Sequence, residues 1–233
     1  MAVSLDFETR LWESGANVVA GIDEVGRGAL AGPVSVGVVA VTRCEGWPEG
    51  LADSKELPVI KRELIADALT GFGAARAVGH ASPAEIDARG IVGALRLAGL
   101  RALASIASVG VVPDAILLDG RHDWLTPPSM DLFAASAGEG EADDGPAPAS
   151  APVTMVVKGD GLCASIAAAS VLAKVERDAI MRAAHKEHPH YGWEGNKGYG
   201  AAEHLEAIRT LGPSPMHRVS WKLPATSACV VPQ

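Results

Sequence analysis

The sequence is short of the features that mark several classes of protein. Aromatic residues make up 4% of its 233 residues, so the core has to be built from Ala, Val, Leu and Ile. Cysteine occurs only at Cys44, Cys163 and Cys229, which offers neither a zinc spacing nor a disulfide framework. No apolar run reaches the ~18 residues of a membrane span, and the first residues lack the regions of a signal peptide. We therefore expect a cytoplasmic protein with no membrane partner.

Basic residues are also in the minority. The chain has 20 Lys and Arg against 28 Asp and Glu, a net charge of -8, and such a balance by itself argues against a nucleic-acid partner. The distribution weakens that argument, because Glu139, Glu141, Asp143 and Asp144 supply half of the net charge. Residues 158–222 carry nine Lys or Arg against seven Asp or Glu. A basic face, if there is one, is expected in the C-terminal third.

The hydrophobic pattern predicts a mixed α/β fold. Apolar residues at 17–25 and 33–41 predict two strands, and the glycine-rich link between them predicts a hairpin. A capping box at Ser82-Pro83-Ala84-Glu85 predicts the start of a short helix. A strand is predicted at 115–118, and helices at 58–70, 91–106, 164–184 and 201–211. Strands followed by alternating helices and strands indicate a mixed sheet with helices.

The chain is expected to be one catalytic domain spanning residues 1–233. A stretch at about 136–152 is rich in Gly, Ala, Pro and acidic residues, which is typical of a flexible surface insertion rather than a domain boundary. The segments before and after it are expected to contribute to one site.

Four acidic residues stand at the ends of apolar runs: Asp23, Glu24, Asp119 and Asp160. A strand that ends in an acid delivers that side chain to the rim of the sheet, where a ligand can bind. Three or four converging carboxylates suit Mg²⁺ or Mn²⁺, which prefer oxygen ligands. Two such ions about 4 Å apart can support phosphodiester hydrolysis.

Two points about these acids stay open from the residues alone. Consecutive strand residues point to opposite faces, so Asp23 and Glu24 can share a site only if the strand ends or bulges there. Asp178, in a helix with Lys174 and Arg177, competes for the place of fourth ligand. A strand-end acid is also common as a turn or helix cap.

Several polar motifs are candidates for phosphate and sugar contacts. Gly26-Arg27-Gly28 follows the first strand, but it matches a dinucleotide fingerprint poorly because another strand follows it. The ring of Tyr199 can stack on a sugar or base, or it can be an ordinary packing residue. The other motifs of this kind are Asp53-Ser54-Lys55, Lys197-Gly198 and His217-Arg218. The histidines His185, His188 and His190 show no zinc spacing and indicate a solvated helix end.

As an ordered set, these pieces resemble the bacterial type 2 ribonucleases H, the ribonuclease HII family. The resemblance covers residues 18–221, and its motifs include Gly21-Ile22-Asp23-Glu24-Val25-Gly26-Arg27-Gly28, Asp53-Ser54-Lys55, Leu118-Asp119-Gly120, Lys158-Gly159-Asp160 and Lys197-Gly198-Tyr199. It implies a ribonuclease H-like fold, with a mixed five-stranded sheet flanked by helices and a small C-terminal helical part. It also implies an endonuclease that cleaves RNA in RNA–DNA hybrids and nicks 5′ to a single ribonucleotide in duplex DNA, which starts ribonucleotide removal.

The same resemblance implies roles for individual residues. Asp23, Glu24, Asp119 and Asp160 are expected to be catalytic and to bind two Mg²⁺ or Mn²⁺ ions, which favours Asp160 over Asp178. Gly26, Arg27 and Gly28 are expected to read a 2′-hydroxyl, largely through the backbone, because that group distinguishes RNA from DNA. Tyr199 is expected to stack on the next deoxyribose. Phosphate-binding or helix-anchoring roles are implied for Lys55, Lys174 and Arg177.

The expected partners are RNA–DNA hybrids and ribonucleotide-containing duplex DNA, bound by a monomer. Two alternative functions remain as hypotheses. A general hybrid nuclease of the type 1 kind would use the same chemistry but need a run of ribonucleotides, which the Gly-Arg-Gly motif disfavours. A module that binds hybrids without cutting is disfavoured by the complete set of four acids.

Overall fold

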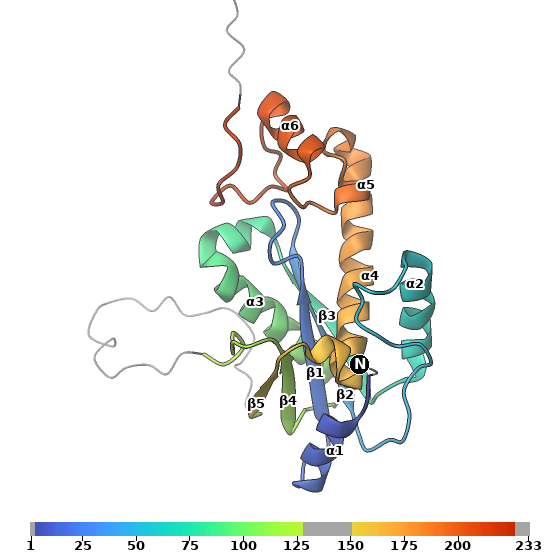
Figure 1. Cartoon of the computed structure of the whole chain (residues 1–233). Coiled ribbons are helices and arrows are strands. Elements are labelled where there is room, and N and C mark those ends of the chain that lie inside the picture. The colour runs from blue at the N-terminus through green and yellow to red at the C-terminus, as the bar shows by residue number, and fades with distance from the viewer. Residues whose placement is uncertain (1–2, 128–150, 227–233) are drawn as a thin grey trace, which may run out of the picture.

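A mixed five-stranded sheet forms the centre of the protein (Figure 1). The computed structural model describes residues 3–127 and 151–226. The strand order is β3-β2-β1-β4-β5. Its strands are β1 (Val19–Val25), β2 (Val34–Val41), β3 (Ala75–Ala81), β4 (Ala115–Asp119) and β5 (Val153–Val156). The predicted hairpin is confirmed, since β1 and β2 pair antiparallel, as do β2 and β3, whereas β4 runs parallel to β1 and to β5.

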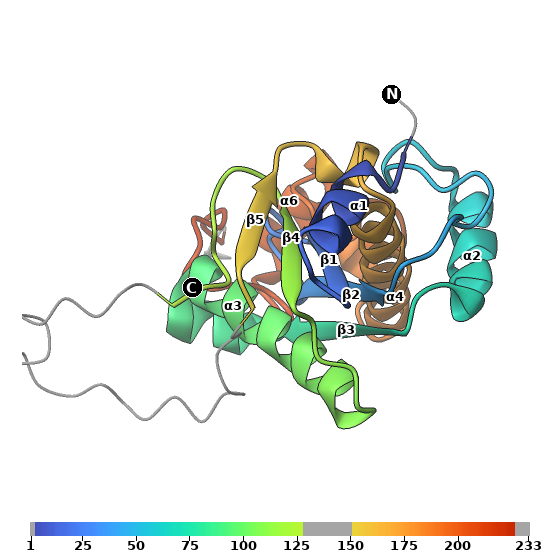
Figure 2. The same ribbon diagram turned by 90° about the horizontal axis from the view of Figure 1, so that it is seen from below.

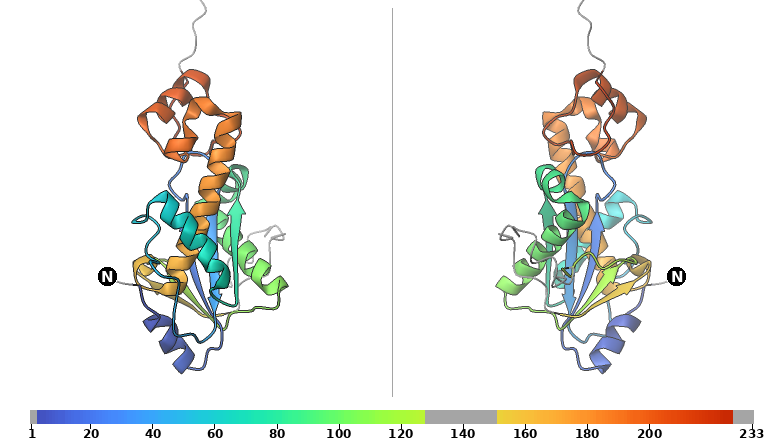
Figure 3. Two further views of the ribbon diagram at one scale, coloured as in Figure 1. Left: turned by 90° about the vertical axis from the view of Figure 1, so that its right-hand side faces the viewer. Right: turned by 90° about the vertical axis from the view of Figure 1, so that its left-hand side faces the viewer.

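Helices cover both faces of this sheet (Figure 2). Helix α3 (Pro83–Ser108) lies on one face, and α4 (Ala164–Glu187) lies on the other with α1 (Asp6–Glu13) beside it and α2 (Val59–Ala68) packed against α4. Figure 3 shows α4 running past the end of the sheet into a small helical lobe. This C-terminal lobe contains α5 (Trp193–Asn196) and α6 (Ala202–Leu211). Short 3-10 turns lie at Leu69–Gly71, Gly159–Gly161 (η3) and Pro189–Tyr191.

The alternation of side chains along the strands divides the core into two layers. Val34, Val36 and Val38 belong to the cluster under α3, while Val39 and Val41 belong to the cluster under α4. This is the period-2 pattern of a strand buried on both faces. The sequence pattern of β2 is therefore confirmed.

Small residues let α4 approach the sheet closely. A Cβ added at Gly37 of β2 would lie 2.2 Å from the carbonyl oxygen of Ala169, and one added at Gly21 of β1 would lie 2.2 Å from the carbonyl carbon of Ser165. The run Ala167-Ala168-Ala169-Ser170 is buried. This contact holds α4 against β1, the strand that carries Asp23.

Helix α3 begins at the predicted capping box. Ser82 accepts from the N–H of Glu85, whose carboxylate accepts from the N–H of Ser82. The helix continues to Ser108 as two helical segments that meet at a kink at Gly90, whose φ is 68°. These segments correspond to the short helix predicted after the capping box and to the helix predicted at 91–106. By length and composition α3 is the one helix of the described residues that could span a membrane. Its apolar residues, among them Leu95 and Ile106, are buried against the sheet.

Four elements were given no range by the sequence prediction: α1, β3, β5 and α5. β3 has a weak strand pattern, Ala75-Arg76-Ala77-Val78-Gly79-His80-Ala81. Its extended conformation is stabilised by pairing with β2 rather than by the strand propensity of its own residues. The predicted insertion at about 136–152 lies outside the described residues except for its last two.

Candidate active site

Three of the four predicted acids meet at one edge of the sheet. Carboxylate oxygens of Asp23, Asp119 and Asp160 all lie within 4.8 Å of one another. β1 and β4 are parallel neighbours with Ile22 opposite Leu118, so the next residues, Asp23 and Asp119, lie side by side. Asp160 follows β5, the next parallel strand, in the turn η3. The carboxyl ends of parallel strands are the common place for a ligand site in such sheets.

The three carboxylates are crowded and largely removed from water. Burial, with repulsion from Asp119 and Glu24, holds the pKa of Asp23 well above its ordinary value. Burial and the charge of Asp160 raise the pKa of Asp119, although the N–H of Gly159 donates to its Oδ1 at 2.7 Å. Buried carboxylates that repel each other are stabilised by a cation. Oxygen donors in this number fit Mg²⁺ or Mn²⁺.

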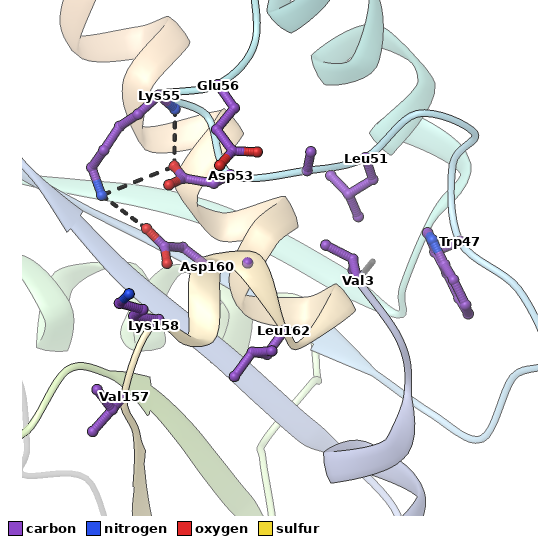
Figure 4. A pocket seen from close by; sticks show the side chains of 12 residues that line it. Val3, Trp47, Leu51, Asp53, Lys55, Glu56, Val157, Lys158, Asp160 and Leu162 are labelled. Carbon is purple, nitrogen blue, oxygen red and sulfur yellow. Dashed lines mark hydrogen bonds and ion pairs between the residues drawn. The ribbon is translucent and has the colours of Figure 1, made fainter. Parts of the chain in front are cut away.

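A lysine already lies against this acidic cluster. Lys55 Nζ is 2.8 Å from Asp160 Oδ2 and 3.9 Å from Asp53 Oδ1 (Figure 4). Burial lowers the pKa of Lys55, but the hydrogen bond and the charge of Asp160 raise it by more, so the pKa is above its ordinary value. Its side chain is 71% exposed. Lys55, predicted to contact substrate, thus lies beside the cluster with most of its side chain accessible to a ligand.

Glu24 is not one of the three acids whose oxygens lie within 4.8 Å of one another. β1 keeps regular pairing with β2 through Val25, so the strand neither ends nor bulges at Asp23. Successive side chains of a strand point to opposite faces, and Glu24 pairs with Arg27 at 3.3 Å. Burial raises the pKa of Glu24, and Asp119 adds repulsion. Glu24 therefore borders the cluster, and its place as a fourth ligand stays a prediction.

A cavity of about 700 Å³ opens beside Asp160. Lys55 and Lys158 lie at its polar end, and Val3, Leu162 and Trp47 form its apolar wall (Figure 4). The cluster is therefore bordered, on the side of Asp160, by a space large enough for a ligand bigger than a metal ion.

The Gly26-Arg27-Gly28 loop comes directly after β1, which ends at Val25. Gly26 has a φ of 84°, a left-handed conformation that favours glycine. A Cβ added at Gly26 would lie 2.1 Å from Arg177 Nε, whereas one at Gly28 would meet nothing within 4 Å. The side chain of Arg27 is 47% exposed. One side of the loop is therefore packed and the other is open.

Tyr199 lies near this loop, in the C-terminal lobe. The guanidinium of Arg177 lies 5.6 Å from the centre of its ring, and the ring is exposed enough to be contacted, since Tyr199 is 40% exposed. Its carbonyl oxygen is 2.8 Å from His204 Nδ1, and Gly198 just before it accepts at its carbonyl from the N–H groups of Leu30 and Ala31. The structure thus joins the two predicted recognition motifs.

Several candidates prove to be buried. Arg177 and Arg218, both fully buried, donate to backbone carbonyls, so the expectation of a surface phosphate contact is wrong for Arg218, and the anchoring alternative holds for Arg177. Lys174 is only 17% exposed in its side chain and pairs with buried Asp178 at 2.5 Å, so Asp178 is outside the cluster.

His217 is buried as well, and it belongs to a polar network in the lobe. Its Nε2 lies 3.1 Å from His204 Nε2, which accepts from Trp193 Nε1 at 3.0 Å. Burial, with the neighbouring His204, lowers the pKa of His217 to about 4. The sequence shows no local signal for this network, because its members come together only through the packing of the lobe.

The fold and the acidic cluster define the class as ribonuclease H-like. The ribonuclease H2 of Pyrococcus horikoshii has a similar fold, with a TM-score of 0.60 at 24% identity over 88% of this chain and 94% of that one. A Bst ribonuclease HIII solved in complex with Mn²⁺ also has this fold, with a TM-score of 0.59 at 19% identity over 89% of this chain and 68% of that one.

Sequence comparison identifies the family within this class. The model of the ribonuclease HII family matches residues 20–224. The ribonuclease HII of Streptomyces avermitilis is 45% identical over 208 residues, which are 89% of this chain and 78% of the relative. The chain belongs to the ribonuclease HII family. It is therefore a ribonuclease H, an endonuclease that hydrolyses phosphodiesters and belongs to a metal-dependent family that acts on RNA–DNA hybrids.

Proposed function

We propose that this enzyme, besides cutting the RNA of RNA–DNA hybrids, nicks duplex DNA on the 5′ side of a single embedded ribonucleotide. The observation that carries the proposal is the position of the Gly26-Arg27-Gly28 loop. It begins next to the acidic cluster on β1, has an open face at Gly28, and is bonded to the segment that carries Tyr199. A loop that contacts one 2′-hydroxyl beside the cutting site can select a lone ribonucleotide.

The metal-binding residues of this proposal are Asp23, Asp119 and Asp160, with Glu24 as the fourth. Their carboxylates would hold Mg²⁺ or Mn²⁺, with two ions in the site. The support is the closeness of the three carboxylates, the raised pKa values of Asp23 and Asp119, and the Mn²⁺ reported for the Bst ribonuclease HIII. When bound, such ions supply an activated water and stabilise the leaving oxygen.

The remaining residues would bind and orient the duplex. Gly26, Arg27 and Gly28 would contact the 2′-hydroxyl, and Tyr199 would stack on the following deoxyribose. Lys55 would leave Asp160 and bind a phosphate next to the cut, since its side chain is exposed and adjoins the cavity. Hydrolysis breaks the bond between phosphorus and the 3′-oxygen, which leaves a 3′-hydroxyl and a 5′-phosphate.

In the cell, this nick would begin the removal of ribonucleotides from DNA. We propose that the enzyme acts in the cytoplasm as a monomer.

Cleavage of a duplex with one ribonucleotide tests the proposal directly. The wild type, Asp23→Asn and the matched surface control Asp67→Asn on α2 would each be incubated with this duplex, an all-DNA duplex and a long RNA–DNA hybrid. Each reaction is run with Mg²⁺, Mn²⁺ or EDTA. We expect one metal-dependent nick 5′ to the ribonucleotide with the wild type and with Asp67→Asn, none with Asp23→Asn, and retained binding by that variant.

The other outcomes are informative. Cutting of the long hybrid alone would indicate a general ribonuclease H. Full turnover by Asp23→Asn would refute the assignment of the metal site. Binding without any cutting by the wild type would indicate a module that only binds hybrids.

A further inference from the structure

Two buried arginines, Arg218 and Arg177, donate hydrogen bonds to backbone carbonyls in and just after the Gly26-Arg27-Gly28 loop. Arg218 Nη2 donates to the carbonyl of Gly26 at 2.7 Å, and its Nη1 donates to the carbonyl of Arg27 at 3.0 Å. Its Nε and Nη2 also donate to the carbonyl of Gly32 at 3.1 and 3.0 Å. One planar guanidinium thus binds the carbonyls of Gly26 and Arg27 in the loop and that of Gly32 after it. This fork geometry is specific to arginine.

Arg177, on α4, binds the segment that follows the Gly26-Arg27-Gly28 loop and also contacts Tyr199. It donates to the carbonyls of Ala31 at 3.1 Å, Pro33 at 2.9 Å and Lys197 at 2.9 Å. Its guanidinium also lies 5.6 Å from the ring of Tyr199. Arg177 therefore contacts both the segment after the loop and Tyr199, alongside the backbone hydrogen bonds from Leu30 and Ala31 to Gly198.

The direction of these carbonyls decides where the neighbouring N–H groups point. A trans peptide unit places its C=O and N–H on opposite sides, and the described residues contain no cis peptide bond. The carbonyl of Gly26 faces Arg218, so the N–H of Arg27 faces away from it. By the same geometry the carbonyl of Arg27, which faces Arg218, turns the N–H of Gly28 away from Arg218. A Cβ added at Gly28 would meet nothing within 4 Å.

We propose that Arg177 and Arg218 are positioning residues for ribonucleotide recognition, because they turn the N–H groups of Arg27 and Gly28 toward the substrate in register with Tyr199. The inference rests on the proposed nicking at single ribonucleotides. Neither arginine touches substrate, since both are fully buried. Burial lowers the pKa of Arg218 only to about 10, so its guanidinium keeps its charge at neutral pH.

A single ribonucleotide and a long hybrid make different demands on this arrangement. A lone 2′-hydroxyl has to meet the loop in one register, whereas a hybrid offers a 2′-hydroxyl at every position of the RNA strand. A displacement of about 1 Å in a positioning group can cost on the order of 100-fold in rate. Loosening the loop should therefore impair nicking at a single ribonucleotide more than cutting of a hybrid.

The test compares Arg218→Lys and Arg177→Lys with the wild type. Both variants keep a positive charge but lose the fork of donors, and Arg101→Lys on α3 is the matched control. The measurement is kcat/KM on the single-ribonucleotide duplex and on the hybrid, with thermal melting to establish folding. We expect the ratio of the two kcat/KM values to fall at least about 10-fold in both variants and to stay unchanged in the control.

The outcomes separate this inference from the proposed function. A wild type that does not nick the single-ribonucleotide duplex would refute the proposed function itself. A wild type that nicks it, with folded variants that lose both activities equally, would overturn the positioning role and leave the function standing.

A second measurement needs no variant. In the wild type with EDTA, NMR should show the amide signals of Arg27 and Gly28 exchanging rapidly with water in the free enzyme. They should shift on adding the ribonucleotide duplex but not the all-DNA duplex. Slow exchange in the free enzyme would mean that these N–H groups face inward, which would overturn the inference even if the lysine variants fail to fold.

Discussion

Replacing Lys55 with methionine should reveal how the acidic cluster is stabilised before a metal binds. Lys55 Nζ lies 2.8 Å from Asp160 Oδ2, next to two further carboxylates. In a water-like dielectric, unit charges at this distance attract by about 1.5 kcal/mol. Because the lysine side chain is 71% exposed, salt and solvent reduce this to about 1 kcal/mol.

The metal-free Lys55→Met protein should therefore melt about 2–4 °C lower than the wild type, as expected for about 1 kcal/mol in a chain of this size. Bound Mn²⁺ would supply the missing positive charge, so the difference between the two proteins should shrink at saturating Mn²⁺. Without a competing ammonium, the variant should also bind Mn²⁺ about 5-fold more tightly.

The assay is thermal melting with and without MnCl₂, together with calorimetric titration of Mn²⁺. Lys61→Met, at an exposed position on α2, is the control and should change neither measurement. The reasoning would be refuted if the melting difference between Lys55→Met and the wild type were the same at saturating Mn²⁺ as in EDTA. Lys55 would then stabilise the fold without balancing the charge of the metal site.

Two further predictions concern stability. Gly37→Ala should lower the free energy of unfolding by about 3 kcal/mol, because the new Cβ would lie 2.2 Å from a backbone oxygen of α4. Gly46→Ala, with open space around it, should be neutral in the same urea titration, and equal midpoints would contradict the close packing. Acid should weaken the fold through His217, whose pKa of about 4 lies below the 6.5 of an unfolded histidine. The unfolded chain takes up the proton first, so stability that is complete above pH 6.5 is lost as the pH falls toward 4, by about 2 kcal/mol between pH 7 and 5. His217→Asn should flatten that dependence in urea titrations, and an unchanged slope would show that other groups cause the loss.

Much of the fold could be predicted from the sequence because its signals are local. The alternation of Val34, Val36 and Val38 is enough to predict a strand with one buried face, and the Ser82 capping box is enough to predict a helix start. The break in α3 was visible as well, since the short helix predicted after Ser82 and the helix predicted at 91–106 meet at Gly90, which is non-helical. β3 was missed because its order comes from pairing with β2.

The candidate site could also be predicted only in part from the sequence. The residue types and the strand ends were enough to select Asp23, Asp119 and Asp160, because an acid after an apolar run is visible in the sequence. Which face each acid occupies was not visible, and regular pairing of β1 placed Glu24 beside the cluster rather than within it.

By itself, the sequence determined the family, the order of the acidic residues and the local starts and turns of the elements, since these depend on residues close together in the chain. Only the tertiary structure decided that Lys55 contacts Asp160, 105 residues away, and that Arg218 holds the carbonyl of Arg27 across 191 residues. Such contacts depend on the packing of the sheet, α4 and the C-terminal lobe. No local pattern encodes them, because each partner alone is an ordinary charged residue.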